Sequence, residues 1–358
     1  MFREDIKVIL MDRKYGLRLT LLIGFLLLLV LIVFLTTIGT ANISFVDTMR
    51  IICQKIPFLG SVVSGEGINE VHSMIVLKVR LPRLIAAAVI GMGLSVSGAA
   101  YQGMFVNPLA DPYVLGVSSG AALGAAIAIA AGFESSVGGF GIAAVAAFVF
   151  SILTIFIVFG IAKTGTKISN TNLLLSGVAV GNFALSVIAV IMVLNRDRVD
   201  KIVFWTLGSV STASWNQLVL LVPIVTCGVI LILIYARDLN IIASGEDEAR
   251  SLGVEVESVK KILLLICSLI VAACVSVGGI IGFVGLIIPH TIRLVTGSDN
   301  RLVLPFSAVG GAIFLIVCDT LARSVVSPAE IPVGALTSMF GAPFFIFLLM
   351  RRKKRMMI

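Results

Sequence analysis

Ser244-Gly-Glu-Asp-Glu-Ala-Arg-Ser-Leu-Gly253 is a short charged segment that separates two long apolar runs, residues 216–236 and 262–282. Each run is long enough to cross a hydrocarbon core of about 30 Å, which takes about 20 helical residues. Ser244 and Asp247 have the spacing of a capping box, acidic residues fill the first turn, and Gly253 supplies a stop signal. The segment therefore predicts a small, complete helix at the membrane surface, where a soluble partner can grip it.

Composition extends this pattern to the whole chain. Of 358 residues, 59% are hydrophobic and 13% are charged, and the apolar residues form continuous blocks. Lipid excludes open-edged strands, and a β-barrel would alternate polar and apolar residues. The sequence therefore predicts an all-α, polytopic membrane protein, with a single transmembrane domain over residues 1–358.

Ten membrane spans are predicted. They cover residues 19–38, 84–106, 113–132, 138–162, 172–194, 216–236, 262–282, 283–297, 302–322 and 333–350. The run 262–297 is either one very long helix or two helices broken near Gly278-Gly279, Gly282 and Pro289. Basic clusters at both termini predict that both ends are cytoplasmic, which requires an even number of spans and favours two helices.

The two halves of the chain share a weak repeat at an offset of 181 residues. Ser95-Val96-x-Gly98 matches Ser276-Val277-x-Gly279, and Pro108 matches Pro289. Five intervening spans would make the repeats inverted, an arrangement common in transporters. A chance match among small residues is the alternative.

Nearly all of these spans lack ionisable residues in their apolar parts. Ion-coupled carriers usually bury such residues as relays or ion sites, so their scarcity argues against proton or sodium coupling, a voltage sensor and a charged filter. The second and third spans instead contain many small residues, among them Gly91, Ser95, Gly98, Gly116 and Gly120. These residues favour close helix packing, or a wall that leaves room for a bulky ligand.

The sequence offers no candidate for an enzyme, a cofactor or a metal site. The five cysteines are scattered, and no CxxC motif, His/Cys cluster or nucleophile–base set is present. Gly160-Ile-Ala-Lys-Thr-Gly165-Thr-Lys167 is not a Walker A loop, because Thr166 separates the second glycine from the lysine. Any ATPase must be a separate chain, and the net charge of +8 reflects membrane topology rather than nucleic-acid binding.

Several separated motifs resemble a known family. They are Arg80-Leu-Pro-Arg83, Gly98-Ala-Ala-Tyr-Gln-Gly103, Asn107-Pro-Leu-Ala-Asp-Pro-Tyr-Val-Leu-Gly116-Val-Ser-Ser-Gly120, Gly279-Ile-Ile-Gly-Phe-Val-Gly-Leu-Ile-Ile-Pro-His290-Thr-Ile-Arg293, Asp299-Asn-Arg301, Asp319-Thr-Leu-Ala-Arg323 and Glu330-Ile-Pro-Val-Gly334. From about residue 75 to 350, the chain resembles the FecCD/BtuC-like permeases, the transmembrane subunits of type II ABC importers for iron siderophores, haem and vitamin B12. The resemblance implies ten helices per subunit and a dimer around a central translocation path.

The same resemblance implies roles for particular residues. The helix at 244–253 matches the coupling helix between spans six and seven, which docks on the ATPase. Its candidate residues are Ser244, Gly245, Glu246, Asp247, Ala249, Arg250, Leu252 and Gly253. Arg80, Arg83 and Arg323 match arginines that pair with glutamates on an external binding protein, a charge-assisted contact that governs encounter and register. Snorkelling to lipid phosphates is the alternative for each arginine.

A cytoplasmic gate is also implied by the resemblance. Asn107 and Leu109, after the second span, and Asn170 and Thr171, before the fifth, match gate positions in similar permeases. Short uncharged side chains can close a pore by packing and reopen it without breaking ion pairs. A turn before Pro108 is an equal alternative for Asn107, and helix capping is one for Asn170 and Thr171.

The resemblance implies the permease subunit of an ABC importer that translocates an iron chelate, a ferric siderophore or haem, across the cell membrane of a bacterium or archaeon. A vitamin B12 importer is the alternative, and a stand-alone secondary carrier or channel is less favoured because membrane-embedded charges are scarce. The implied partners are a second permease subunit, identical or related, two cytoplasmic ATP-binding subunits, an extracellular or periplasmic substrate-binding protein, and membrane lipid. We expect no bound cofactor, no metal and no nucleic acid.

Overall fold

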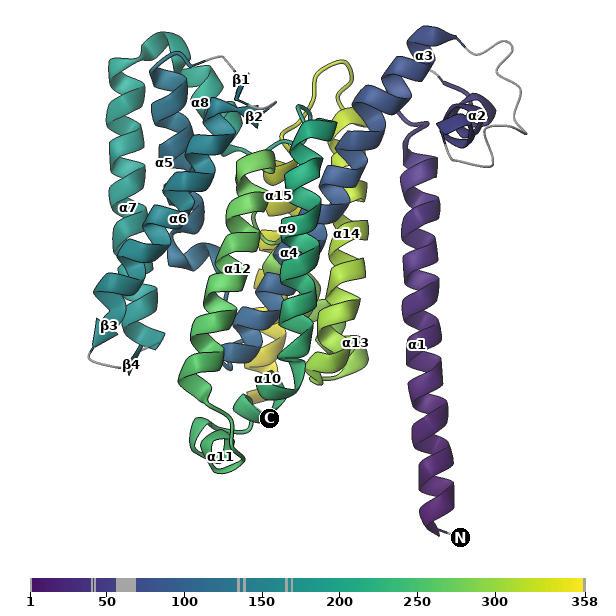
Figure 1. Cartoon of the computed structure of the whole chain (residues 1–358), viewed down its shortest axis with the longest axis vertical. Coiled ribbons are helices and arrows are strands. Elements are labelled where there is room, and N and C mark those ends of the chain that lie inside the picture. Colours follow the sequence, from purple (N-terminus) through teal and green to yellow (C-terminus); the bar gives the residue numbers. More distant parts are fainter. Residues whose placement is uncertain are drawn as a thin grey trace.

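The computed structural model describes residues 2–39, 41, 43–55, 69–133, 136–137, 140–164, 167–168 and 170–356. Most of the chain forms long helices that run along the longest axis of the molecule (Figure 1). The helical elements are α1 (Phe2–Leu35), α2 (Phe45–Lys55), α3 (Glu70–Met74), the π-helical η1 (Ile75–Arg80), α4 (Leu81–Met104), the 3₁₀ turn η2 (Pro112–Leu115), α5 (Val117–Ala130), α6 (Ile142–Ala162), α7 (Asn170–Leu194), the 3₁₀ turn η3 (Arg196–Arg198), α8 (Val199–Thr206), α9 (Trp215–Ile234), α10 (Ala236–Ile242), α11 (Glu246–Ser251), α12 (Val256–Gly278), α13 (Val284–Thr296), α14 (Asn300–Ser324) and α15 (Val333–Met356). Two small antiparallel pairs complete the fold, β1 (Ser136–Val137) with β2 (Phe140–Gly141) and β3 (Lys163–Thr164) with β4 (Lys167–Ile168).

The apolar helices confirm the predicted all-α, polytopic fold. Among the described residues, six helices are long and apolar enough to cross a membrane, and four apolar helices are shorter. Together they correspond, in order, to the ten predicted spans. The run 262–297 is two helices, because α12 ends at Gly278 and α13 begins at Val284. Gly279 and Phe283, with φ of 66° and 68°, turn the chain between them.

The second span begins earlier than the sequence predicts. Residues Glu70–Met104 form one helical segment of 35 residues through α3, η1 and α4, whereas the predicted start is residue 84. A basic residue such as Arg80 would ordinarily mark the end of a span. Here the Arg80 side chain is buried and donates to backbone carbonyls, so its charge is accommodated within the helical segment.

α4 is the central helix of the fold. It contacts α9, α12, α13 and α14, and nearly all of its side chains are buried. A methyl group at Gly91 would overlap the Gly311 carbonyl, and one at Gly98 would overlap the Gly285 carbonyl. Ser95 Oγ donates a hydrogen bond of 2.6 Å to the Ser307 carbonyl. Along α4, the small residues therefore serve close helix packing.

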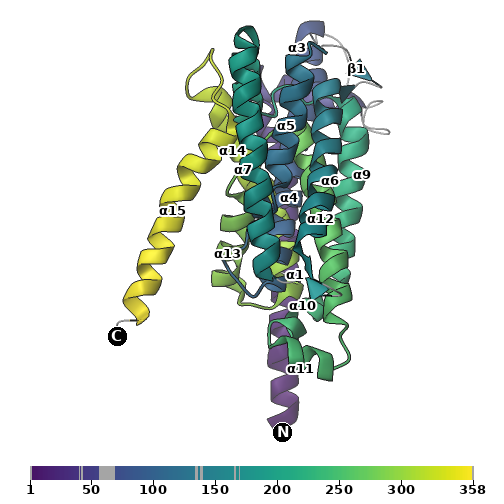
Figure 2. The same cartoon turned by 90° about the vertical axis from the view of Figure 1, so that its left-hand side faces the viewer.

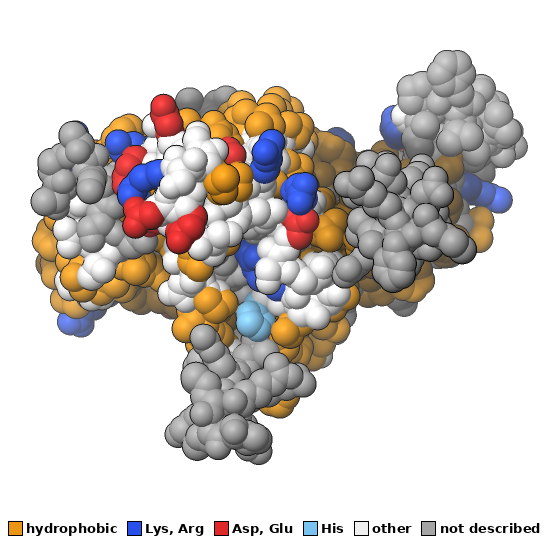
Figure 3. All heavy atoms as spheres, turned by 90° about the horizontal axis from the view of Figure 1, so that it is seen from below, with side chains coloured by type: hydrophobic (Ala, Val, Ile, Leu, Met, Phe, Trp, Pro, Cys, Tyr) orange, Lys and Arg blue, Asp and Glu red, His pale blue; other side chains and the backbone are white. Residues whose placement is uncertain are grey.

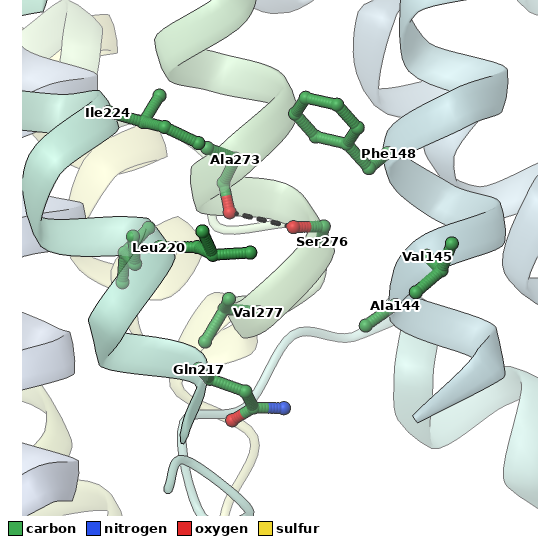
Figure 4. Close-up of a pocket in the computed structure, with 10 residues that line it drawn as sticks. Ala144, Val145, Phe148, Gln217, Leu220, Ile224, Ala273, Ser276 and Val277 are labelled. Atoms are coloured by element: carbon green, nitrogen blue, oxygen red, sulfur yellow. Dashed lines mark hydrogen bonds between the residues drawn. The ribbon is translucent and has the colours of Figure 1, made fainter. Parts of the chain in front are cut away.

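α12 joins two groups of helices. α5, α6, α7 and α8 lie together on one side of the molecule, and α4, α9, α13 and α14 lie on the other (Figures 1 and 2). α12 contacts α5 and α6 in the first group and α4 and α9 in the second. A cavity of about 210 Å³ lies at this junction, lined by Ala273 and Ser276 of α12, Phe148 of α6 and Leu220 of α9, among other residues (Figure 4). The packing around α12 is therefore incomplete at this point.

The ends of the molecule differ in content. Figure 1 shows α11, the start of α1 and the end of α15 at one end, which we call the α11 end, and α2 and α3 at the other, the α2 end. Figure 2 shows that α15 leans away from the other helices toward the α11 end. Both ends of the chain thus lie on the same side of the molecule, as an even number of spans requires.

We expect Gly98→Ala to destabilise the protein, because the added methyl group would force α4 and α13 apart. Overpacking of this kind costs about 1–3 kcal/mol. Gly160→Ala is the matched control, since no atom lies within 4 Å of a methyl group at that helical position. Thermal unfolding of both variants in detergent would check this, and equal stability of the two would contradict the packing assigned to α4.

Candidate functional site

The predicted charged helix exists, but it is shorter than expected and is capped differently. α11 spans Glu246–Ser251, and its N-cap is Gly245, with φ of 139° and no side-chain capping bond. The predicted capping box between Ser244 and Asp247 is therefore wrong. Ser244 precedes the cap, its amide donates to the Ile241 carbonyl, and the Asp247 carboxylate bonds to Arg250 at 2.8 Å instead. The predicted stop is confirmed, because Gly253 has φ of 84° and follows the last turn.

α11 has a buried side and an exposed side. Ala249 is fully buried, whereas the Asp247 side chain is 94% exposed and Leu252 is 70% exposed. Seen from the α11 end, the face of the molecule carries acidic and basic side chains close together (Figure 3). A cavity of about 460 Å³ opens beside α11, between Arg250 and the segment 253–258. This end therefore presents a polar surface with one prominent apolar side chain.

Ion pairs attach the buried side of α11 to the start of α12. Lys260 Nζ donates to Glu246 Oε1 at 2.5 Å, and the Lys260 side chain is only 8% exposed. Arg250 lies 3.6 Å from Glu246 and 3.8 Å from Glu257 of α12. Glu246 is thus held between its own helix and a membrane helix.

A second polar junction attaches α10 to α14. Asn240 Nδ2 donates to Asp299 Oδ1 at 2.6 Å, and Asn240 Oδ1 accepts from the Asn300 amide at 2.8 Å. Arg293 of α13 donates to Asn300 Oδ1 and to the Ala99 carbonyl of α4. Burial alone would raise the pKa of Asp299, but hydrogen bonds from Asn240 and Arg301 outweigh it and hold that pKa below its ordinary value. The segment preceding α11 is therefore bonded to the start of α14, which is itself bonded to Arg293 of α13.

The arginines predicted to dock a binding protein lie at the α2 end, and all three are buried. Arg80 donates to the carbonyls of Thr36, Thr37 and Ala41, which follow α1. Arg323 donates to the Leu35 carbonyl at 2.8 Å. In this conformation both guanidinium groups hold the end of α1, where helical carbonyls lack intrahelical partners.

Arg83 has acidic partners within the chain. It binds Asp319 at 2.9 Å and Glu330 at 2.9 Å. The Asp319 side chain is fully buried, whereas the Glu330 side chain is 42% exposed and borders a cavity of about 440 Å³ near Lys201 and Trp205. Asp319 and Glu330 both lie in motifs that carry the family resemblance, but no role was predicted for either residue. Their ion pairs with Arg83 join positions 236 and 247 residues apart, which sequence spacing does not reveal.

The predicted gate residues fall at the ends of α4 and α7. Asn107 Oδ1 accepts from the Leu109 amide at 3.0 Å, so Asn107 does form the turn considered as its alternative role. The Leu109 side chain is 40% exposed, and Val106 takes the left-handed conformation, with φ of 49°. Thr171 is exposed at the start of α7, and the side chain of Asn170 lies outside the described residues. Gating itself stays a prediction.

Within the described ranges, no group of three His, Cys, Asp or Glu side chains is arranged to hold a metal ion. The polar features lie instead at the two ends of an apolar bundle.

The structure combines a bundle of apolar helices with the charged surface helix α11 at one end and three buried arginines at the other. This arrangement is that of an integral membrane permease. The model of the FecCD transport family matches residues 26–351. The chain belongs to this family.

Individual relatives agree with this assignment. The chain is 41% identical to the cobalamin import system permease protein BtuC of Halobacterium salinarum, over 81% of this chain and 77% of that protein. It is 37% identical to the hemin transport system permease protein HmuU of Yersinia pestis, over 94% of this chain and 97% of that protein. A solved structure, described as an inward-facing conformation of a putative metal-chelate type ABC transporter, matches with a TM-score of 0.79 and 30% identity, covering 93% of this chain and 99% of that one. The chain is thus an ABC importer permease, and its relatives are transport components of such importers.

We expect Asp319→Asn to destabilise the protein far more than Glu330→Gln, although both carboxylates bind Arg83. Removing one partner of a buried ion pair costs up to about 3–5 kcal/mol when the other charge is left buried and unpaired, and the remaining contact of Arg83 with Glu330 would reduce this cost. An exposed pair contributes about 0–1 kcal/mol. Thermal unfolding in detergent would measure both, and a larger effect of Glu330→Gln would mean that burial does not set the strength of this cluster.

Proposed function

We propose that this chain is the transmembrane subunit of an importer that carries an iron chelate, a ferric siderophore or haem, across the cytoplasmic membrane. Energy would come from ATP bound and hydrolysed by two subunits on separate chains. The observation that carries this proposal is α11, a charged helix that is bonded to membrane helices on one side and open to a partner on the other. Such a helix suits transfer of motion between a soluble partner and the bundle.

An iron chelate is favoured as the cargo by the match to the hemin permease, which extends over nearly the full length of both chains. A cobalamin importer is the second candidate, supported by a slightly higher identity over a shorter stretch. Both cargoes are large metal chelates, which a wide and mostly uncharged path between two subunits would admit. A carrier that works without ATP is the least favoured candidate.

The proposed complex has two permease subunits, identical or related, around a central path. α7 and α15 carry large apolar side chains that are exposed in the isolated chain, among them Phe183 and Val193 on α7 and Met339 and Phe347 on α15. Lipid and the second subunit would cover these faces. The α11 end, with both ends of the chain, would face the cytoplasm, in agreement with its basic termini.

At the α11 end, the coupling surface would comprise residues 244–253. Ser244, Asp247, Arg250, Leu252 and Gly253 are exposed and available to the ATP-binding subunit. Gly245, Glu246 and Ala249 would instead set the shape and attachment of α11. Asn107, Leu109, Asn170 and Thr171 would form the gate on the same side of the membrane.

At the α2 end, an external substrate-binding protein would dock. Because Arg80, Arg83 and Arg323 are buried and bonded within the chain, acidic groups of that protein would reach them only by displacing their present partners. Glu330 is the partly exposed member of this cluster and borders the open cavity. Docking would therefore act first on the contact between Glu330 and Arg83.

ATP-dependent uptake tests the function directly. The chain would be reconstituted in proteoliposomes with a candidate ATP-binding subunit and substrate-binding protein from the same organism, and supplied with ⁵⁵Fe-labelled hydroxamate siderophore, haemin or cyanocobalamin. We expect accumulation of an iron chelate only when ATP is inside the vesicles. Uptake of cyanocobalamin alone would establish the second candidate, and uptake without ATP would contradict the importer.

We expect Leu252→Asp to weaken binding of the ATP-binding subunit about tenfold or more, because truncating or charging an apolar anchor at an interface commonly costs over 1 kcal/mol. Val295→Asp is the matched control, since Val295 is also apolar and exposed, at 81%, but lies outside α11. Pull-down titration in nanodiscs would measure both affinities. Equal losses would argue against α11 as the specific docking element.

A further inference from the structure

α11 is too short to hold its own orientation. It contains six residues, and isolated helices of even 12 residues are marginal in water. Gly245 and Gly253 flank it, with φ of 139° and 84°, conformations that glycine adopts without the steric cost of a side chain. The position of α11 relative to the membrane helices therefore depends on its side-chain contacts.

Lys260 provides the closest of these contacts to a membrane helix. It lies in the first turns of α12, is almost completely buried, and donates to Glu246 Oε1 at 2.5 Å. The Lys260 ammonium group is buried, so water screens its attraction to the partly exposed Glu246 carboxylate less than it screens a fully exposed pair. Arg250 adds weaker contacts to Glu246 and to Glu257, at 3.6 and 3.8 Å, and its side chain is 45% exposed. The pair Glu246–Lys260 is thus the firmest link between α11 and α12.

α12 is the helix through which such a link would act on the whole bundle. It contacts both groups of helices, and the cavity of about 210 Å³ beside Ser276 lies where these groups meet (Figure 4). This cavity is partly open, because Val145 and Leu220 in its lining are 41% and 50% exposed, and it leaves side chains more room to shift than a close-packed interior does. A push on the start of α12 can therefore alter the packing between the groups.

The junction at Asn240 supplies a fixed point. Asn240 ties α10 to the start of α14 through Asp299 and Asn300, so the chain entering α11 is held while α11 itself can pivot at Gly245. Motion of α11 would then pass mainly to α12, whose first turns carry its ion-pair partner.

We infer that Lys260 is a positioning residue that transmits displacement of α11 to α12 through its ion pair with Glu246. This inference rests on the proposed function, because it presumes that an ATP-binding subunit moves α11. Lys260→Met removes the charge and keeps most of the length of the side chain. Glu246 is 40% exposed and stays near Arg250, so this variant leaves no buried, unpaired carboxylate.

The experiment reads the movement of α12 without any cargo. Ser276→Cys carries a bimane fluorophore at the cavity, in a background with Cys53→Ser and Cys227→Ser, the two least buried cysteines. The permease is assembled in nanodiscs with a candidate ATP-binding subunit from the same organism, recognised by its Walker A motif. Bimane emission is recorded before and after ATP with vanadate, and ATP hydrolysis is measured in parallel.

For Lys260→Met we expect the nucleotide-dependent change in emission to fall roughly fivefold or more, the low end of coupling effects between sites. ATP hydrolysis and complex formation should persist. Lys261→Met, at the exposed neighbouring lysine, should behave like the unchanged permease. The exchanged pair Glu246→Lys with Lys260→Glu should recover the signal, because the effect depends on the ion pair and not on the lysine itself. Persistence of ATP hydrolysis and of complex formation in Lys260→Met distinguishes this role from a purely structural one.

Other outcomes separate the two proposals. A Lys260→Met signal equal to that of Lys261→Met, or no recovery in the exchanged pair, would overturn the role of Lys260 and leave the importer intact. If the unchanged permease hydrolyses ATP in the complex without any change in bimane emission, α12 does not move. That result would also overturn the role of Lys260 and leave the importer intact. Failure of the unchanged permease to bind the ATP-binding subunit would overturn the proposed function, and this inference with it.

Discussion

The close approach of helix backbones along α4 is the constraint on which the rest of the structure depends. Lipid is as apolar as the helices themselves, so helices associate in a membrane through contact area and hydrogen bonds rather than through burial from water. Gly91 and Gly98 remove the side chains that would keep α13 and α14 away, and Ser95 adds a hydrogen bond to the Ser307 carbonyl. α4 thereby also positions residues at both ends of the molecule. Arg80 and Arg83 lie at its start, and the turn at Asn107 follows its end.

Charged side chains are buried to different extents at the two ends of the bundle. At the α2 end, Arg83 and Asp319 are buried together, where an ion pair fixes geometry more than it adds stability. At the α11 end, Lys260 is the deeply buried charged residue among those that the structure describes, and its partner Glu246 remains partly open to water. One end is consequently built to hold neighbouring helices in place, and the other to combine a firm attachment with an accessible surface.

Much of this architecture follows from the sequence, because the bilayer permits few solutions. Apolar runs of span length predict the ten helices, and a charged segment between two spans can only lie at the surface, where α11 is found. The capping of α11 was mispredicted, since Ser244 and Asp247 have suitable spacing but Gly245 occupies the cap. The inverted repeat remains a prediction.

Other features have no signature in the sequence. Arg80 and Arg323 bond to main-chain carbonyls, which every residue possesses, so nothing in the sequence marks Thr36 or Leu35 as a partner. Glu246 and Lys260 belong to different helices, and Asn240 meets Asp299 across 59 positions, so the spacing rules of a single helix do not reveal either contact.

The anchoring of α1 also bears on the order in which the chain is assembled during synthesis. α1 emerges first from the ribosome, yet the carbonyls at its far end bond to Arg80, 44 residues after Thr36, and to Arg323, 288 residues after Leu35. Until those arginines have been made, these carbonyls lack their guanidinium donors, although the Leu35 carbonyl also accepts from the Ile38 amide at 3.3 Å. The end of α1 can thus gain its contact with Arg80 early, but its contact with Arg323 only after α14 has been made, so a ribosome that stalls before α14 leaves α1 partly anchored.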